Sequence, residues 1–406
     1  MEYESHTLRN GIRVVHLPLK SEVAYCGFVI GVGSRDEKNG EEGMAHFVEH
    51  MLFKGTHKHT ASYILNRIES VGGELNAYTT KEHICVYSTF LCPYFDRAVD
   101  LLGDIVFNST FPERELRKEA NVICEEINSY KDTPSELIFD DFENLLFQNH
   151  PLGHNILGEE EDIEEVTSEE LLRFLQSTYN PEEIVFFSLG KMNFKTIVRK
   201  LDPLGEVSFS SSYKREKLSP AYTPFKKIVK KDTFQTHVLL GNLSYTFAEE
   251  KEKIALGLLN NILGGPNMNS VLNMALREKK AWVYEVESNV TCFSDTGMFS
   301  IYFACDRKNE GRCLSMVMKE LKHFQNEALS TLKLDRAKKQ LYGQFGIAND
   351  NHESLALVLG KSFLQQNYFE SLKERMIKFE KITSSDLLEV ANYVFDEDKL
   401  SILSYH

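Results

Sequence analysis

The feature that most constrains the fold is a repetition between the two halves of the chain. Residues 167–172 (TSEELL) have the N-terminal signature of a helix and precede an apolar strand, EIVFFSLG. The same order recurs 216 residues later, from 167 to 383, where TSSDLL precedes KLSILSY. A second pair of segments, 76–91 and 289–305, has strand character and leads into a helix in each half. Two diverged copies of one unit explain this order.

Each copy contains strands, a helix, a hairpin, further helices and a last strand, which is typical of an α+β domain. We therefore predict two homologous domains, each a mostly antiparallel sheet with helices packed on it. Residues 208–224 (SFSSSYKREKLSPAYTP) are rich in Ser, Pro and charge and have no apolar periodicity. They indicate a linker between a first domain, 1–207, and a second domain, 225–406.

Composition and charge restrict the class of protein. The 406 residues are 42% hydrophobic and 26% charged, which is typical of soluble globular proteins. The formal net charge of −14 would repel phosphate backbones and anionic membranes, so it argues against a nucleic-acid partner. The longest apolar runs fall well short of the roughly 20 residues that span a bilayer, so we expect no membrane segment.

Two further features favour the cytoplasm. The N-terminal residues show neither a basic region followed by an apolar core nor an Arg- and Ser-rich amphipathic pattern, so no targeting segment is predicted. The seven cysteines are scattered without a C-x-x-C pair, which suits reduced thiols better than a disulfide framework.

The segment 43–56, GMAHFVEHMLFKGT, places His46, Glu49 and His50 in an otherwise apolar run. In a helix, positions four apart differ by about 40° around the axis and positions three apart by about 60°, so the three side chains share a face. Two neutral imidazoles one turn apart suit zinc, and a neighbouring carboxylate can take a proton from a zinc-bound water. An exposed helix face with ordinary polar residues is the alternative. A third ligand is needed to decide between them.

A later segment offers candidates for that ligand. Residues 114–132 (RELRKEANVICEEINSYKD) have the pattern of an amphipathic helix. Glu119 and Glu126 lie two turns apart and therefore on one face, whereas Glu125 points elsewhere. On this pattern alone, a solvated face of glutamates remains the alternative.

These residues resemble the inverted zincins of the pitrilysin type, which include insulin-degrading enzyme and the mitochondrial processing peptidases. The H-F-V-E-H motif is similar to the family motif, and Glu126 lies 76 residues after His50, a spacing that the family shares. GGELNAYTTKEHICVY, HPLGHNILG and LREKKAWVY also resemble family blocks, in family order. The resemblance implies that His46, His50 and Glu126 bind one Zn²⁺ per chain, that Glu49 is the general base and that Glu119 steadies the site.

The resemblance also implies the residues that contact substrate. In the family, an edge strand pairs with the backbone of the substrate, and the matching residues are Asn76, Ala77, Tyr78 and Thr79. Arg277 and Tyr284 match an Arg and a Tyr that hold substrate and stabilise the oxyanion. The repeat pairs the zinc motif with 259–263 (LNNIL), which has no titratable side chain. Only the first domain is therefore expected to hold the zinc chemistry.

Two departures from the family pattern affect these expectations. GGPNMNSVLN stands where relatives commonly carry a Gly-rich stretch, and the only tryptophan precedes Tyr284, so substrate fit is expected to differ. His57 and His59 replace less metal-prone residues. We interpret them as loop histidines, because three protein ligands and a water already complete a catalytic zinc site.

The expected function is that of a zinc metalloendopeptidase acting on short or unfolded peptides in an enclosed chamber. The short members of the family carry two repeat units, so a closed chamber implies a homodimer in which Arg277 and Tyr284 of one chain face the zinc of the other. One alternative is a peptidase that processes presequences or leader peptides. The other is a non-catalytic scaffold of the same fold, against which the intact zinc set argues.

Overall fold

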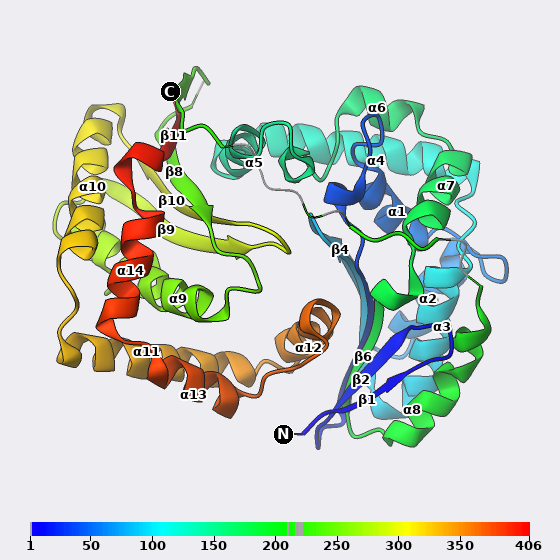
Figure 1. Cartoon of the computed structure of the whole chain (residues 1–406). Coiled ribbons are helices and arrows are strands. Elements are labelled where there is room, and N and C mark those ends of the chain that lie inside the picture. Colours follow the sequence, from blue (N-terminus) through cyan, green and yellow to red (C-terminus); the bar gives the residue numbers. More distant parts are fainter. Residues whose placement is uncertain (1, 209–210, 216, 218–221, 232) are drawn as a thin grey trace. The chain divides into compact units, whose positions relative to one another are not determined.

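The computed structural model describes residues 2–208, 211–215, 217, 222–231 and 233–406. The chain forms two compact units, each with one sheet and its own packed helices (Figure 1). Unit 1 consists of Met1–Asn128, His154–Glu216 and Ala348–Ser371, and unit 2 consists of Ser129–Gly153, Lys217–Ile347 and Leu372–His406. The predicted linker, 208–224, lies partly outside the described residues.

The sheet of unit 1 has six strands in the order β1-β2-β6-β3-β5-β4. The β2–β6 pair is parallel and the other pairs are antiparallel. The strands are β1 (Glu4–Thr7), β2 (Arg13–Pro18), β3 (Val23–Ile30), β4 (Glu74–Thr79), β5 (Ile84–Leu91) and β6 (Ile184–Gly190).

The sheet of unit 2 repeats this arrangement with five strands in the order β7-β11-β8-β10-β9. Its β7–β11 pair is parallel and its other pairs are antiparallel, so each strand of unit 2 has a counterpart in unit 1. Among the residues that the structure describes, β1 alone has no counterpart in unit 2. The α+β class and the internal repeat are confirmed. The strands are β7 (Lys226–Val229), β8 (Thr236–Ser244), β9 (Val283–Cys292), β10 (Gly297–Cys305) and β11 (Ser401–Tyr405).

The helices that mark the repeat begin as the sequence predicts. Thr167 caps α7 (Ser168–Thr178) and Thr383 caps α14 (Ser384–Val394). In both, the threonine hydroxyl accepts from the backbone N–H of an acidic residue three positions on, and that residue's carboxylate accepts from the threonine N–H. These reciprocal caps satisfy backbone donors at the same place in each copy.

The remaining helices are divided between the two units, and some pack on a sheet while others pack on helices. Those within or starting in unit 1 are α1 (Met44–Leu52), α2 (Ala61–Glu69), α3 (Phe95–Phe107), α4 (Glu113–Lys131), α6 (Glu160–Glu165), α8 (Phe194–Leu201) and α12 (His352–Gln366). Those within or starting in unit 2 are α5 (Pro134–Leu146), α9 (Glu250–Gly264), α10 (Glu310–Asn326), α11 (Thr331–Asn349) and α13 (Leu372–Lys381). In the described part of the chain, none of these helices combines the length and apolarity needed to cross a bilayer.

Each half of the chain provides one helix to the sheet of the other half. The helix α5 comes from the first half but packs on β8 and β11, whereas α12 comes from the second half but packs on β2, β3 and β6. The units therefore depart from the continuous domains 1–207 and 225–406 that the sequence suggested. The reason is that the central strands are apolar on both faces, and local sequence patterns do not show which helix covers the second face.

The helix α12 approaches the sheet closely at a glycine. Leu355, Leu359 and Phe363 pack with Phe187 of β6 and Val29 of β3 in one buried cluster. A Cβ atom on Gly360 would lie 2.6 Å from Cδ1 of Phe187 and 2.9 Å from a methyl group of Val29. Both distances are too short for real contacts, so the absence of a side chain at this position sets the separation of helix and sheet.

We expect the Gly360→Ala substitution to lower the free energy of unfolding by about 1–3 kcal/mol, because the added methyl group overpacks the interface. The matched control is Gly343→Ala in α11, where the added Cβ would meet no atom within 4 Å apart from the adjacent residues and the backbone of its own helix. There the higher helix propensity of alanine should stabilise the protein by up to about 1 kcal/mol. Urea denaturation followed by circular dichroism measures both, and equal effects of the two substitutions would contradict the account.

Candidate metal centre and active site

The helix that carries the H-x-x-E-H motif, α1, has a fixed starting point. Gly43 precedes it in the left-handed region (φ 89°), and a Cβ there would lie 2.7 Å from the carbonyl oxygen of Leu157. The buried carboxylate of Glu37 accepts hydrogen bonds from the N–H groups of Gly43 (3.1 Å) and Ala45 (2.8 Å). These bonds satisfy orphan donors of the first turn and hold the start of the helix in place.

Burial raises the pKa of the Glu37 carboxyl well above its usual value, while the two backbone hydrogen bonds act in the opposite direction. This side chain was not identified from the sequence. It lies seven residues before the first residue of α1 and nine before His46. No spacing rule connects a loop carboxylate with a helix start at that distance.

His46, His50 and Glu126 come together as the sequence predicts, from α1 and α4. One potential ligand atom of each lies within 4.8 Å of the others. The Nε2 atoms of His46 and His50 are 3.8 and 3.6 Å from Oε2 of Glu126. The two imidazole rings lie with centroids 4.6 Å apart at 70° to one another. Two nitrogens and one oxygen around a common point form the donor set of a catalytic zinc site with an open fourth position.

The protonation of His46 fits a metal. Burial, and then the neighbouring His50, lower the pKa of His46 to about 3. His46 is therefore neutral near pH 7, so its approach to Glu126 is not an ion pair. A neutral imidazole has one ring nitrogen with a free lone pair, which is the form that binds a metal cation.

Glu119 supports His50 from behind. Its Oε2 accepts a hydrogen bond from Nδ1 of His50 at 3.2 Å, and its Oε1 is paired with Nζ of Lys54 at 2.7 Å. Burial raises the pKa of the Glu119 carboxyl, but the hydrogen bonds from His50 and Lys54 outweigh it and the net shift is downward. An ionised Glu119 holds the proton of His50 on Nδ1 and leaves Nε2 for a metal.

Glu49 points from α1 toward the edge strand β4. Its Oε2 accepts a hydrogen bond from Oγ1 of Thr79 at 2.6 Å. Burial raises the pKa of the Glu49 carboxyl, whereas the Thr79 hydrogen bond lowers it. A raised pKa suits a group that must take up a proton and release it again.

The predicted substrate strand, Asn76 to Thr79, forms most of β4 at the edge of its sheet. Its inner side pairs with β5, with Asn76 opposite Tyr87 and Thr79 opposite Ile84. Two glycines precede the strand: Gly72 has a φ of 76°, and a Cβ on Gly73 would lie 2.7 Å from the carbonyl oxygen of Thr89. The outer side of β4 offers backbone donors and acceptors of the kind that bind an extended peptide.

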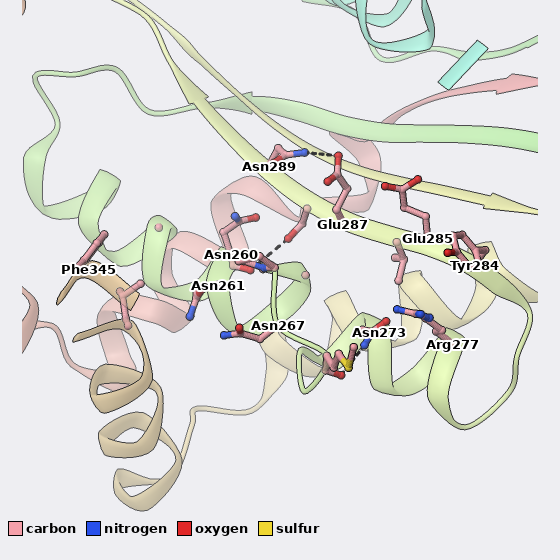
Figure 2. A pocket seen from close by; sticks show the side chains of 18 of the residues that line it. Asn260, Asn261, Asn267, Asn273, Arg277, Tyr284, Glu285, Glu287, Asn289 and Phe345 are labelled. Atoms are coloured by element: carbon pink, nitrogen blue, oxygen red, sulfur yellow. Dashed lines mark hydrogen bonds between the residues drawn. The ribbon is translucent and has the colours of Figure 1, made fainter. Parts of the chain in front are cut away.

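Arg277 and Tyr284 belong to unit 2, where they line one end of a pocket (Figure 2). The pocket has a volume of about 590 Å³. Asn260 and Asn261 of α9 and Asn267 of the loop after it line one side, and residues of β9 line another. The guanidinium carbon of Arg277 lies 5.5 Å from the ring centre of Tyr284, which is 78% exposed. A cation over an exposed tyrosine ring leaves both polar groups available to a ligand.

The pocket lies where the repeat places the counterpart of the zinc motif. The helix α9 packs against the edge strand β9 as α1 packs against β4. It presents Asn260 and Asn261 instead of histidines. Among the described residues the one group with metal-ligand geometry is His46, His50 and Glu126, so the zinc chemistry has no second copy there.

The other polar residues singled out from the sequence lie outside this group. His57 is exposed, and the ring of His59 stacks on Tyr63 with centroids 3.9 Å apart. Glu125 is exposed on α4 and is not part of the ligand set. The interpretation of His57 and His59 as loop histidines agrees with these positions.

The chain matches two protein-family models. Residues 13–160 match the model described as insulinase (peptidase family M16), and residues 165–341 match the model described as the peptidase M16 inactive domain. The first match contains the three candidate ligands and Glu49. The second contains Arg277 and Tyr284, so the two matches follow the same division of chemistry as the two repeats.

Similar proteins and structures cover nearly the whole chain. The "uncharacterized zinc protease YmxG" of Bacillus subtilis is 31% identical over 97% of this chain and 96% of its own length, and an "uncharacterized zinc protease" of Rickettsia bellii is 32% identical over 97% and 95%. A protease from Helicobacter pylori has a similar fold, with a TM-score of 0.90 at 23% identity over 100% and 99% of the two chains. The structure titled peptidase M16 inactive domain, from Pseudomonas fluorescens, gives 0.92 at 20% identity over 100% and 98%. On these matches the chain belongs to peptidase family M16, the insulinase family.

Proposed function

We propose that this protein is a zinc-dependent endopeptidase. The observation that carries the proposal is the convergence of His46, His50 and Glu126 around one point, with Glu49 beside them and an edge strand next to Glu49. Relatives named zinc proteases support both the metal and the reaction class. We propose one zinc ion per chain.

Different residues of the chain bind the metal, transfer the proton and bind the peptide. Zinc held by His46, His50 and Glu126 would supply a Lewis acid and lower the pKa of a water molecule. Glu49 takes a proton from the attacking water and passes it to the leaving amine. The outer edge of β4 binds the peptide backbone and aligns it with Glu49.

We propose that the substrates are short or unfolded peptides, because pairing with an edge strand requires an extended backbone. Such recognition reads the backbone more than the side chains. A peptidase that processes leader peptides would instead make one cut near a fixed motif. Cysteine usage in the sequence supports a cytoplasmic location.

We further propose a homodimer in which Arg277 and Tyr284 of one chain complete the site of the other. One observation supports this: Tyr284 is exposed and, with Arg277, belongs to a unit other than the one with the zinc ligands. The resemblance to the two-repeat members of the family, stated above, implies the same arrangement. In that arrangement Arg277 and Tyr284 would bind the carbonyl oxygen as negative charge develops on it.

The Glu49→Gln substitution tests the assignment of the base. The variant should keep its zinc and lose at least about 100-fold in kcat, because glutamine has a similar shape but cannot take the proton. The measurement is cleavage of a mixed peptide library, read by mass spectrometry, together with metal analysis of the purified protein. Turnover at the wild-type rate in this variant would refute the assignment.

Two adjacent glutamates on α4 provide a matched test of the metal ligands. Glu126→Gln should weaken zinc binding at least about 10-fold, since it removes one of three ligands, and should abolish peptide cleavage. Glu125→Gln removes the same charge from an exposed neighbour outside the ligand set and should leave zinc content unchanged. Competition with a chromophoric chelator measures the affinity, and equal affinities of the two variants would exclude Glu126 as a ligand.

Mixed dimers test the proposed sharing of sites. Glu49→Gln and the double variant Arg277→Ala/Tyr284→Phe, each inactive alone, are co-expressed with different tags and purified as mixed dimers. If the sites are shared, one of the two in each mixed dimer is intact, and about half of the wild-type rate should return. If each chain builds its own site, the mixed dimers stay inactive.

A further inference from the structure

The side chain of Thr79 connects the edge strand β4 with the carboxylate of Glu49. Its Oγ1 donates to Oε2 of Glu49 at 2.6 Å, a short distance typical of a hydroxyl bound to a charged acceptor. Among the described residues, Thr79 is the one hydrogen-bond partner of the Glu49 side chain. The orientation of that carboxylate therefore depends on a single bond from the strand.

We propose that Thr79 is a positioning residue for Glu49, in addition to its place on the strand that binds peptide. By holding Oε2, the hydroxyl turns the carboxylate so that Oε1 remains available for the proton of the attacking water. This inference rests on the proposed peptidase function and deepens it, because it joins substrate binding and proton transfer through one side chain.

The position of Thr79 on the strand supports this role. It is the last residue of β4, and side chains alternate between the two faces of a strand. Tyr78 packs with the buried cluster between the sheet and α12, so Thr79 points to the opposite face, toward α1. There it reaches Glu49, which is otherwise 30 residues away in the sequence.

The surroundings hold Thr79 and α1 in one framework. The turn after β4 is tied to the segment before α1 by backbone hydrogen bonds from Ser34 to Thr80 (3.3 Å) and from Arg35 to Lys81 (2.9 Å). A buried ion pair between Arg35 and Glu82, at 2.7 Å, joins the same two segments.

From this framework the chain continues directly to Glu37, which holds the start of α1. The donor on the strand and the acceptor on the helix are thus both anchored to residues 34–37, as a pre-organised site requires.

The arrangement has a consequence for catalysis. A peptide that pairs with the outer edge of β4 adds hydrogen bonds to the strand whose last residue orients the base. Part of the binding energy of the peptide is then used to order the base, which lowers the barrier of the chemical step more than it changes affinity. A purely structural hydroxyl would instead affect the stability of the strand and the binding of peptide.

The test compares three substitutions that act on hydroxyl groups. Thr79→Val keeps the shape and removes the donor, and Thr79→Ser keeps the donor and removes a methyl group. Thr89→Val is the matched control on the adjacent strand β5, because the buried Oγ1 of Thr89 has no hydrogen-bond partner among the described residues. Zinc content and thermal unfolding are measured for each, so that a variant with a damaged fold is recognised.

We expect Thr79→Val to lower kcat by between about 10-fold and 100-fold with KM changed less than about 2-fold. Thr79→Ser should recover most of kcat, and Thr89→Val should match the wild type. In crystal structures, the Glu49 carboxylate should keep one orientation in the wild type and in Thr79→Ser, and lose it in Thr79→Val.

Two results would overturn the inference: a wild-type kcat for Thr79→Val, or an unchanged Glu49 orientation in the crystal structure of that variant. These two results can be told apart from a failure of the proposed peptidase function. A wild-type protein that cuts no peptide would overturn both, whereas active wild type alongside an equally active Thr79→Val variant would overturn this inference alone.

Discussion

A sheet whose central strands are apolar on both faces needs a covering layer on each face, and the rest of this structure depends on how the chain meets that requirement. The strands β6 and β10 are buried along their whole length. One face of each sheet is covered by helices that follow it locally, and the other by a helix from the opposite half of the chain, α12 or α5. The repeat therefore supplies two similar sheets that each remain incomplete without the other copy.

On this shared scaffold the two copies have diverged in chemistry. The helix next to the edge strand carries His46, Glu49 and His50 in one copy and Asn260 and Asn261 in the other. In the first copy each reactive group has a supporting partner: Glu119 for His50, Thr79 for Glu49, and Glu37 for the start of the helix. In the second copy a pocket lined by Arg277 and Tyr284 occupies the corresponding place, and its described residues form no metal-ligand group.

The sequence predicted those parts of the molecule that depend on short-range order. Helix geometry predicts the caps at Thr167 and Thr383 and the shared face of His46 and His50. It also places Glu119 and Glu126 on one face of α4. The resemblance to a known family connected α1 with α4. Lys54, Glu37 and the side-chain role of Thr79 could not be predicted, because each depends on which loop or strand packs beside α1. The exchange of α5 and α12 was missed for the same reason: an amphipathic helix shows that it has an apolar face, not which sheet that face covers.

The exchange has a consequence for how such a chain can be divided. The helices α4 and α11 each contain a boundary between the two units, at Asn128/Ser129 and at Ile347/Ala348, so the polypeptide passes between the units inside regular structure. A half-length polypeptide would leave Phe187 and its apolar neighbours facing water. A single copy of the repeat would need a second molecule to provide a helix for that surface.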